Sequence, residues 1–299
     1  MVSPKITAWL DLTRVHFAIV WPVLFCSGLA LAFYNYGGFS WSLTITAAFI
    51  GLFGFIAGLV LNDYVDRHLD RTETPDNPLT RYWRPFGTRP IPQDLISSRQ
   101  AFTLFLVLAS AATVLIATLP APHSVYVFVI MLWSYGVEVF YQIKKRNQKF
   151  PVAQIVGRTD LTLFPIAGYL CVGQLDMTVV LFAFFFYPFA LAHLGVNDLA
   201  DMESDRLRKM KTIGVLYGAA GCVWWVVFFT FLHLAAASLF VYHVILVALP
   251  GFLLAFILLC GALYLLWRSK DAASAMKALP LFHAALFIEA LSLILATVL

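Results

Sequence analysis

Two copies of one acidic motif carry most of the chemistry that this sequence can be expected to perform. The first copy occupies residues 62–71 and the second occupies residues 197–206, and both read Asn-Asp-x-x-Asp-x-x-x-Asp-Arg. If each motif is helical, its three aspartates fall within an arc of about 60°. Like charges on one helical face repel, so each motif is expected to bind a cation. The six aspartates are Asp63, Asp66, Asp70, Asp198, Asp201 and Asp205.

The ligand chemistry favours a hard divalent cation. Carboxylate oxygens suit Mg²⁺ or Mn²⁺ better than zinc or copper. Mg²⁺ commonly uses one or two carboxylates and completes its octahedron with water and substrate phosphate. Two facing motifs would therefore form a site for two or three metal ions that also binds a diphosphate. One motif alone could be an ordinary solvated helix end, but two identical motifs argue against that reading. The predicted metal ligands are the six aspartates together with Asn62 and Asn197.

The elements that hold these motifs are predicted to be membrane-spanning helices. Of the 299 residues, 61% are hydrophobic and 12% are charged, whereas charged residues make up about a quarter of a soluble domain. A span needs about 20 apolar residues, and the sequence predicts an all-α membrane protein with about nine of them. The spans are expected at 15–36, 43–62, 101–119, 124–143, 152–174, 177–197, 213–235, 242–266 and 278–298.

Three of these spans are less sharply defined than the others. Arg158 and Asp160 lie inside the first turns of the fifth span. The seventh and eighth spans come from a single run, Ile213–Trp267, that contains no Lys, Arg, Asp or Glu. That run is too long for one crossing, so a turn is expected near Ser238–His243.

The basic residues predict an orientation. With a cytoplasmic N-terminus, all 20 lysines and arginines fall on the cytoplasmic side, and none fall in the loops near 37–42, 120–123, 174–177 and 236–241. Cytoplasmic loops carry an excess of Lys and Arg. We therefore predict a multi-pass protein of the cell membrane with its N-terminus inside and its C-terminus outside. The net charge of +4 is accounted for by this asymmetry and gives no reason to expect a nucleic-acid partner.

The spacing of the motifs also predicts an internal repeat. An even number of spans separates the second span from the sixth, so the two motif-bearing helices run in the same direction. A parallel pseudo-repeat would place both acidic clusters at one membrane depth. Long polar loops, 63–100 and 198–212, follow the two motifs on the cytoplasmic side.

Together with Arg89-Pro90-Ile91-Pro92, the first motif resembles the first signature of the UbiA superfamily of intramembrane prenyltransferases. The second motif, leading to Lys211-Thr212, is similar to the second acidic motif of that family. Arg14 with His16-Phe17, and the segment 141–146, are consistent with less specific family features. The resemblance covers the whole chain, which is expected to be one domain over residues 1–299. The chain departs from the family in a longer segment between Asp70 and Arg89, and in Asp94, where the family often has glycine.

The resemblance implies a nine-helix bundle with a central apolar cavity capped by cytoplasmic loops. It implies transfer of a prenyl group from a prenyl diphosphate to an aromatic or lipid acceptor. Mg²⁺ and basic side chains would stabilise the departing diphosphate, and aromatic faces would stabilise the allylic cation. The phenylalanines at 184–186 are candidates for the cavity lining, and His193 is expected to point towards it. The candidate diphosphate ligands are Arg71, Arg89, Tyr141, Lys144, Arg206 and Lys211.

Two other functions are compatible with the acidic motifs. A divalent-cation transporter could use them, although transporters usually place such residues near the bilayer midplane. A member of the same family could instead ionise a prenyl diphosphate without any acceptor. The acceptor stays open among a hydroxybenzoate, a naphthoate, a homogentisate, a haem and a glycerol-phosphate lipid. Glu289, in the middle of the ninth span, is expected to face the bundle interior because a charge in lipid is costly.

Overall fold

The structure is a computed structural model that describes residues 3–72 and 77–297. Within those ranges the regular elements are helices, which confirms the predicted all-α fold. Eight of the described helices are long and apolar enough to cross a membrane, so the chain is an integral multi-pass membrane protein. They are α2 (Val20–Tyr36), α3 (Trp41–Asp66), α5 (Ser98–Ala117), α6 (His123–Lys144), α9 (Met177–Ala200), α11 (Ile213–Val244), α12 (Leu249–Ser269) and α13 (Ala272–Ala296).

The fifth predicted span is divided into two short helices. Helix α7 (Val152–Gly157) and helix α8 (Thr159–Tyr169) are separated at Arg158, whose φ of −76° and ψ of 1° leave the helical region. The expected nine spans are therefore an approximate count, with α7 and α8 in the place of one continuous crossing.

The predicted turn between the seventh and eighth spans was misplaced. Residues 238–243 continue α11, which ends at Val244, and the turn lies at residues 245–248. The segment 238–243 contains neither proline nor glycine, so nothing in it stops a helix. Pro250 stands at the start of α12, where its missing N–H and fixed φ are compatible with a first helical turn.

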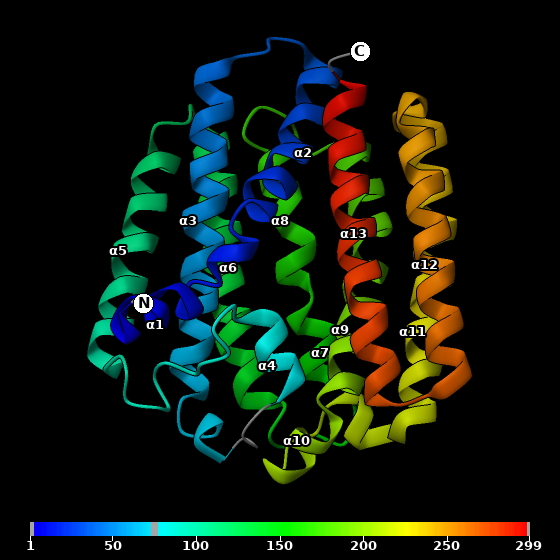
Figure 1. Cartoon of the computed structure of the whole chain (residues 1–299). Helices are drawn as coiled ribbons and strands as arrows, with labels where there is room; N and C mark the ends of the chain where they lie inside the picture. The colour runs from blue at the N-terminus through cyan, green and yellow to red at the C-terminus, as the bar shows by residue number, and fades with distance from the viewer. Residues whose placement is uncertain (1–2, 73–76, 298–299) are drawn as a thin grey trace.

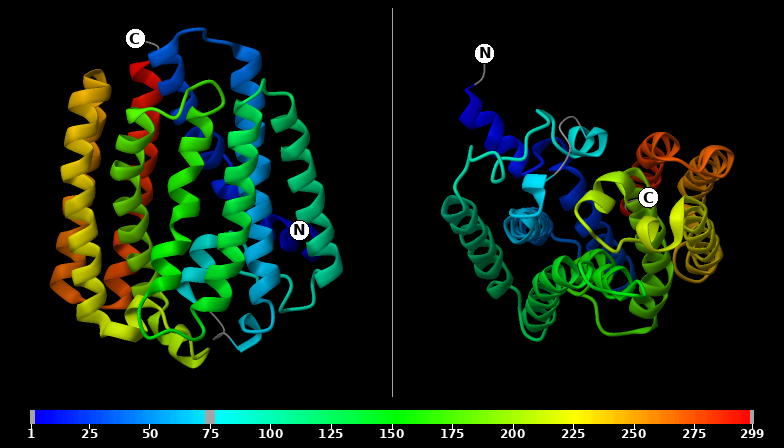
Figure 2. Two further views of the ribbon diagram at one scale, coloured as in Figure 1. Left: turned by 180° about the vertical axis from the view of Figure 1, so that it is seen from behind. Right: turned by 90° about the horizontal axis from the view of Figure 1, so that it is seen from below.

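The helices form one bundle, in which α8 is part of the wall. Figure 1 shows the whole bundle, and in the view from behind in Figure 2 α8 lies in front, between α6 and α9. Helix α8 packs against α2, α6 and α9, while α13 closes the ring between α2 and α9. Helix α5 covers α3 from outside, and α11 and α12 cover α9 and α13.

Helices α2 and α8 approach each other unusually closely through two glycines. A Cβ atom on Gly28 would lie 1.8 Å from the carbonyl oxygen of Pro165, and one on Gly168 would lie 1.8 Å from the carbonyl oxygen of Phe25. Small residues at such crossings let backbones touch in membrane proteins. The close packing of α8 against α2 therefore depends on these two residues.

Three short helices lie outside the main spans: α1 (Pro4–Leu12), α4 (Pro78–Trp83) and α10 (Met202–Leu207). Figure 1 shows α4 and α10 at one end of the bundle, with the end of α13 at the opposite end.

Glu289 faces the bundle interior, as predicted. It is 2% exposed, and its Oε1 lies 3.0 Å from Nε2 of His233 on α11. His233 also lies 3.0 Å, through Nδ1, from the carbonyl oxygen of Phe185. The pair therefore connects α13, α11 and α9 within an otherwise apolar core.

Candidate active site

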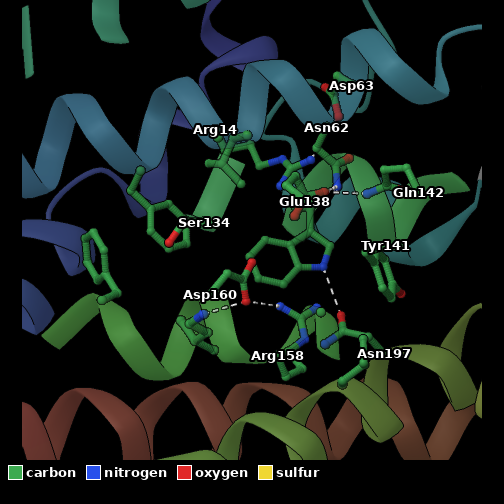
Figure 3. Close-up of a pocket in the computed structure, with 18 of the residues that line it drawn as sticks. Arg14, Asn62, Asp63, Ser134, Glu138, Tyr141, Gln142, Arg158, Asp160 and Asn197 are labelled. Atoms are coloured by element: carbon green, nitrogen blue, oxygen red, sulfur yellow. Dashed lines mark hydrogen bonds and ion pairs between the residues drawn. The ribbon is translucent and has the colours of Figure 1, made fainter. Parts of the chain in front are cut away.

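A cavity of about 330 Å³ lies among α2, α3, α6, α8, α9 and α13, beneath α4. Its lining combines the motif aspartates, which follow α3 and α9, with aromatic and aliphatic side chains of the membrane-spanning helices. Figure 3 labels ten of the lining residues. All six motif aspartates contribute to this lining, as do Asn62 and Asn197. Two segments 135 residues apart in the sequence thus contribute to one space.

Neither motif is a single continuous helix, in contrast to the helical geometry considered from the sequence. Helix α3 ends at Asp66, and Asp70 begins a separate 3₁₀ turn. Helix α9 ends at Ala200, Asp201 has φ −102° and ψ 8°, and Asp205 lies on α10. The breaks change the direction of the chain within each motif, so the aspartates reach the cavity from separate elements and not from one helical face.

Asp63 is held by two arginines. Nη2 of Arg84 lies 2.8 Å from both carboxylate oxygens of Asp63, and Nη2 of Arg14 lies 3.0 Å from Oδ1. Asp63 and Arg84 are each 4% exposed. This buried ion pair fixes the loop after α4 to the end of α3.

Asp198, the equivalent aspartate of the second motif, is also engaged within the protein. Its Oδ2 accepts a 2.9 Å hydrogen bond from the backbone N–H of Ile213 and a 3.5 Å hydrogen bond from Gln154. The first contact ties the start of α11 to α9. The first aspartate of each motif therefore connects elements of the fold.

The other four aspartates face basic side chains at the mouth of the cavity. The carboxylate of Asp66 forms ion pairs with Nζ of Lys145 at 2.8 Å and with Nη2 of Arg146 at 3.0 Å. Oδ2 of Asp70 forms an ion pair with Nη1 of Arg89 at 2.7 Å. These pairs bring positive charge from α6 and from the loop before α5 to the end of the first motif.

Arg208 joins the two motifs. Its Nη1 lies 3.0 Å from Asp70 of the first motif, and its Nη2 contacts Asp201 and lies 3.0 Å from Asp205 of the second. The Arg208 side chain is 6% exposed, and its Nε is buried without a hydrogen-bond partner. A single guanidinium thus lies between three carboxylates.

The structure divides the predicted diphosphate ligands into two groups. Arg89 and Tyr141 line the cavity. The other four do not contribute to its lining: Arg71 pairs with exposed Asp94, Arg206 pairs with exposed Glu203, Lys211 is exposed and Lys144 is half-buried.

Five basic residues that pair with motif aspartates were not among the predicted diphosphate ligands: Arg14, Arg84, Lys145, Arg146 and Arg208. The basic run 144–146 signalled Lys145 and Arg146 without distinguishing them from Lys144. Arg208 was not detectable from the repeat, because the break at Asp201 changes which residues after it face inwards. Arg84 lies in a long loop whose path the sequence does not define.

The carboxylates suit a divalent cation by chemistry, although they are not preassembled around one. Among the residues that the structure describes, no group of three or more His, Cys, Asp or Glu side chains is arranged to hold a metal ion. Basic side chains stand between the carboxylates instead. Burial and the neighbouring charge of Asp201 nevertheless raise the pKa of Asp205 to about 6, despite the presence of Arg208. Carboxylate oxygens of this kind are the ligands that Mg²⁺ prefers in proteins.

The inner end of the cavity is aromatic. Trp21 stacks on Phe55 with ring centroids 3.6 Å apart, and Phe164 meets Phe55 at 5.0 Å and Phe25 at 5.2 Å. All four residues line the cavity. The phenylalanines proposed from the sequence, 184–186, do not: Phe184 is 73% exposed on the outer surface, and the other two are buried in the core beside α11. Consecutive residues of α9 point in different directions, and none of these three side chains lines the cavity.

His193, which was expected to point towards the cavity, does line it. Its Nε2 lies 2.8 Å from Nε2 of His283 on α13, and Nδ1 of His283 lies 2.6 Å from the hydroxyl of Tyr82. Asn197, one turn later on α9, accepts a 3.1 Å hydrogen bond from Trp83. These contacts hold α4 over the cavity.

Comparison with known proteins gives concordant results. The sequence pattern of the UbiA prenyltransferase family matches residues 19–288. The digeranylgeranylglyceryl phosphate synthase of Thermococcus kodakarensis is 23% identical over 297 residues, which are 97% of this chain and 98% of that protein. The 4-hydroxybenzoate octaprenyltransferase of Hydrogenovibrio crunogenus is 25% identical over 219 residues, which are 72% of this chain and 70% of that protein.

Solved structures share the fold. The apo structure of a UbiA homolog from Aeropyrum pernix K1 matches with a TM-score of 0.72 and 18% identity over 99% of both chains. A UbiA homolog from Archaeoglobus fulgidus, bound to DMAPP and Mg²⁺, matches with a TM-score of 0.63 and 15% identity over 96% of this chain and 98% of that chain.

Proposed function

Because this chain belongs to the UbiA prenyltransferase family, we propose that it transfers the prenyl group of a prenyl diphosphate to an acceptor, with Mg²⁺ bound between its two aspartate motifs. The proposal rests on one observation above all, the division of a single cavity into a charged end and an aromatic end. A prenyl diphosphate is divided in the same way, into an anionic head and an apolar tail.

The metal ligands in this proposal are Asp66, Asp70, Asp201 and Asp205, which lie at the mouth of the cavity. Asp63 and Asp198 are assigned to holding the fold, because Asp63 joins α3 to the loop after α4 through Arg84, and Asp198 joins α9 to α11 through the backbone N–H of Ile213. When bound, Mg²⁺ supplies positive charge that stabilises the departing diphosphate. The homolog bound to DMAPP and Mg²⁺ supports this choice of metal and donor.

The basic side chains at the mouth have a second role in the proposal. Arg89, Lys145 and Arg208 pair with the carboxylates at 2.7–3.0 Å, apart from the closer contact of Arg208 to Asp201. The same donors lie within the space that the diphosphate would occupy. Once the carboxylates are neutralised, these donors are available to phosphate oxygens, for which guanidinium groups have a matching geometry.

The aromatic end binds the prenyl chain and protects the allylic cation. Trp21, Phe55 and Phe164 line the cavity and pack against one another, and aromatic rings attract a positive charge. They also exclude water, which would otherwise capture the cation.

The test uses the protein in lipid nanodiscs with labelled prenyl diphosphates of several lengths and a panel of phenolic and lipid acceptors. We expect transfer that needs Mg²⁺ and is abolished by EDTA or by Asp66→Asn. Asp94→Asn is the matched control, because this carboxylate is 80% exposed in the same loop. Undiminished transfer in EDTA would overturn the metal mechanism. Release of prenyl products without any acceptor would identify the acceptor-free reaction instead.

A further inference from the structure

A second group of polar side chains lines the cavity away from the aspartates. Ser134 and Glu138 lie one turn apart on α6, and Arg158 and Asp160 flank the start of α8. Figure 3 shows them on the walls of the cavity. Glu138 precedes Lys145, the partner of Asp66, by seven residues, which places its backbone about 10 Å further along the helix axis. The group therefore lies deeper in the membrane than the proposed metal site.

The carboxylates of this group keep free hydrogen-bonding capacity. Oε1 of Glu138 accepts hydrogen bonds of 2.5 Å from Asn62 and of 2.5 Å from Gln142. Oδ1 of Asp160 accepts from the backbone N–H of Leu161. Within residues 3–72 and 77–297, the second oxygen of each carboxylate has no hydrogen-bond donor. Two acceptor atoms on the cavity wall are thus available to a bound molecule.

Arg158 and Ser134 also keep donor capacity, although Arg158 is ion-paired with Asp160 and lies over the ring of Tyr141. The Arg158 guanidinium lies 4.0 Å from Oδ1 of Asp160, which is beyond hydrogen-bond distance, and its Nε is buried without a partner. Ser134 makes no side-chain hydrogen bond to any described residue. Buried donors without partners are costly, and ionisable residues inside membranes usually mark functional sites.

The remaining basic residues of the cavity are already used. Arg14, Arg84, Arg89, Lys145 and Arg208 each pair with a motif aspartate. Glu138, by contrast, has no salt bridge to a described residue and is held by amides alone. The second oxygens of Glu138 and Asp160 therefore remain open to a bound molecule, whereas Asp66, Asp70, Asp201 and Asp205 are each paired with a basic side chain.

The charge of the wall selects the kind of molecule that fits it. Arg158 and, at longer range, Arg14 compensate the two carboxylates. A carboxylate or phosphate on the acceptor would add a charge without a counter-ion in a water-poor space, where an uncompensated charge is strongly unfavourable. Hydroxyl groups can donate to the free carboxylate oxygens and accept from Arg158 and Ser134.

We propose that Ser134, Glu138, Arg158 and Asp160 form the acceptor subsite, and that the acceptor is an uncharged molecule bearing at least two hydroxyl groups. The inference rests on the proposed prenyl transfer and specifies its second substrate. The donor head is bound at the aspartates, and the acceptor is bound at the α6–α8 wall beside the aromatic end.

The test compares three phenols that differ only at the position opposite the hydroxyl: hydroquinone, 4-methoxyphenol and 4-hydroxybenzoate. Binding to the protein in nanodiscs is measured by saturation-transfer NMR, and kcat/KM for prenylation is measured with labelled geranyl diphosphate. Hydroquinone should be favoured over each of the others by about tenfold. Glu138→Gln and Asp160→Asn should each reduce the discrimination against 4-hydroxybenzoate and leave the KM for the prenyl diphosphate unchanged.

Controls separate this inference from the proposed function. Asp94→Asn removes an exposed carboxylate and should leave the ratios of kcat/KM among the three phenols unchanged. Two single variants at different helices guard against a folding defect in either one. A wild-type preference for 4-hydroxybenzoate, the absence of phenol binding, or unchanged ratios in both variants would overturn the acceptor subsite. Selective binding of hydroquinone without any prenyl transfer would instead overturn the proposed reaction and leave the subsite standing.

Discussion

At the scale of single residues, Arg208 and Arg206 form a contrast that can be tested. Arg208 is buried between three carboxylates of both motifs, whereas Arg206 is exposed and pairs with Glu203. Removing one partner of a buried ion pair costs about 3 kcal/mol, because the other charges are left uncompensated. We therefore predict that Arg208→Gln lowers the melting temperature of the protein in EDTA.

The same substitution should strengthen the response to metal. Without Arg208, a divalent cation no longer competes with an internal positive charge. Mg²⁺ should then raise the melting temperature of Arg208→Gln more than it raises that of the wild type. Arg206→Gln is the control and should behave as the wild type does. Equal melting temperatures of the two variants in EDTA would contradict a bridging role for Arg208.

A second prediction at this scale concerns the two motifs acting together. If Asp66 and Asp201 hold one metal–diphosphate complex, losing either should disable the whole complex. Asp66→Asn, Asp201→Asn and the double variant should then all reduce prenyl transfer by a similar, large factor, as residues acting as a unit do. The measurement is the transfer rate as a function of Mg²⁺ concentration. Multiplicative losses would indicate two independent sites.

At the scale of elements, the crossing of α2 and α8 determines whether the aromatic end of the cavity forms. Gly28 and Gly168 leave no room for a Cβ against the opposing backbone. Gly28→Ala should push the helices apart and destabilise the protein by about 1–3 kcal/mol, the usual cost of overpacking. Gly136→Ala is the control, because Gly136 is exposed and has open space around it. Thermal melting in detergent compares the two, and an equal stability would argue against the close crossing.

Elements also show how far the sequence could be interpreted. The span predicted at 124–143 differs by one residue at each end from the helix His123–Lys144, because an apolar run bounded by polar residues defines a crossing by its length. The break at Arg158 and the breaks within both motifs were not predictable in this way. They depend on contacts between distant segments, such as the Arg208 contact to Asp70, which local periodicity does not encode.

At the scale of the whole molecule, the orientation in the membrane stays a prediction. The distribution of basic residues places the loops after α3 and α9 in the cytoplasm, and Figure 1 shows the end of α13 at the other end of the bundle. In a variant without native cysteines, Asp94→Cys should react with an impermeant maleimide only from the cytoplasmic side, and Thr297→Cys only from the outside. If the maleimide labelled Asp94→Cys and Thr297→Cys from the same side of the membrane, an odd number of crossings would be contradicted.

The bilayer around this protein contains many phospholipid phosphate groups. The ion pairs at the cavity mouth determine whether those phosphates can bind there. Arg89 and Arg208 are held by buried carboxylates, so an incoming phosphate must compete with them for these arginines. A phospholipid headgroup offers a single phosphodiester charge and no divalent cation to occupy the vacated aspartates. A diphosphate that binds together with a divalent cation compensates both members of each ion pair that it breaks. The diphosphate pairs with the arginine, and the cation pairs with the aspartate. Host lipids, although present in vast excess, are thereby poor competitors for the entrance.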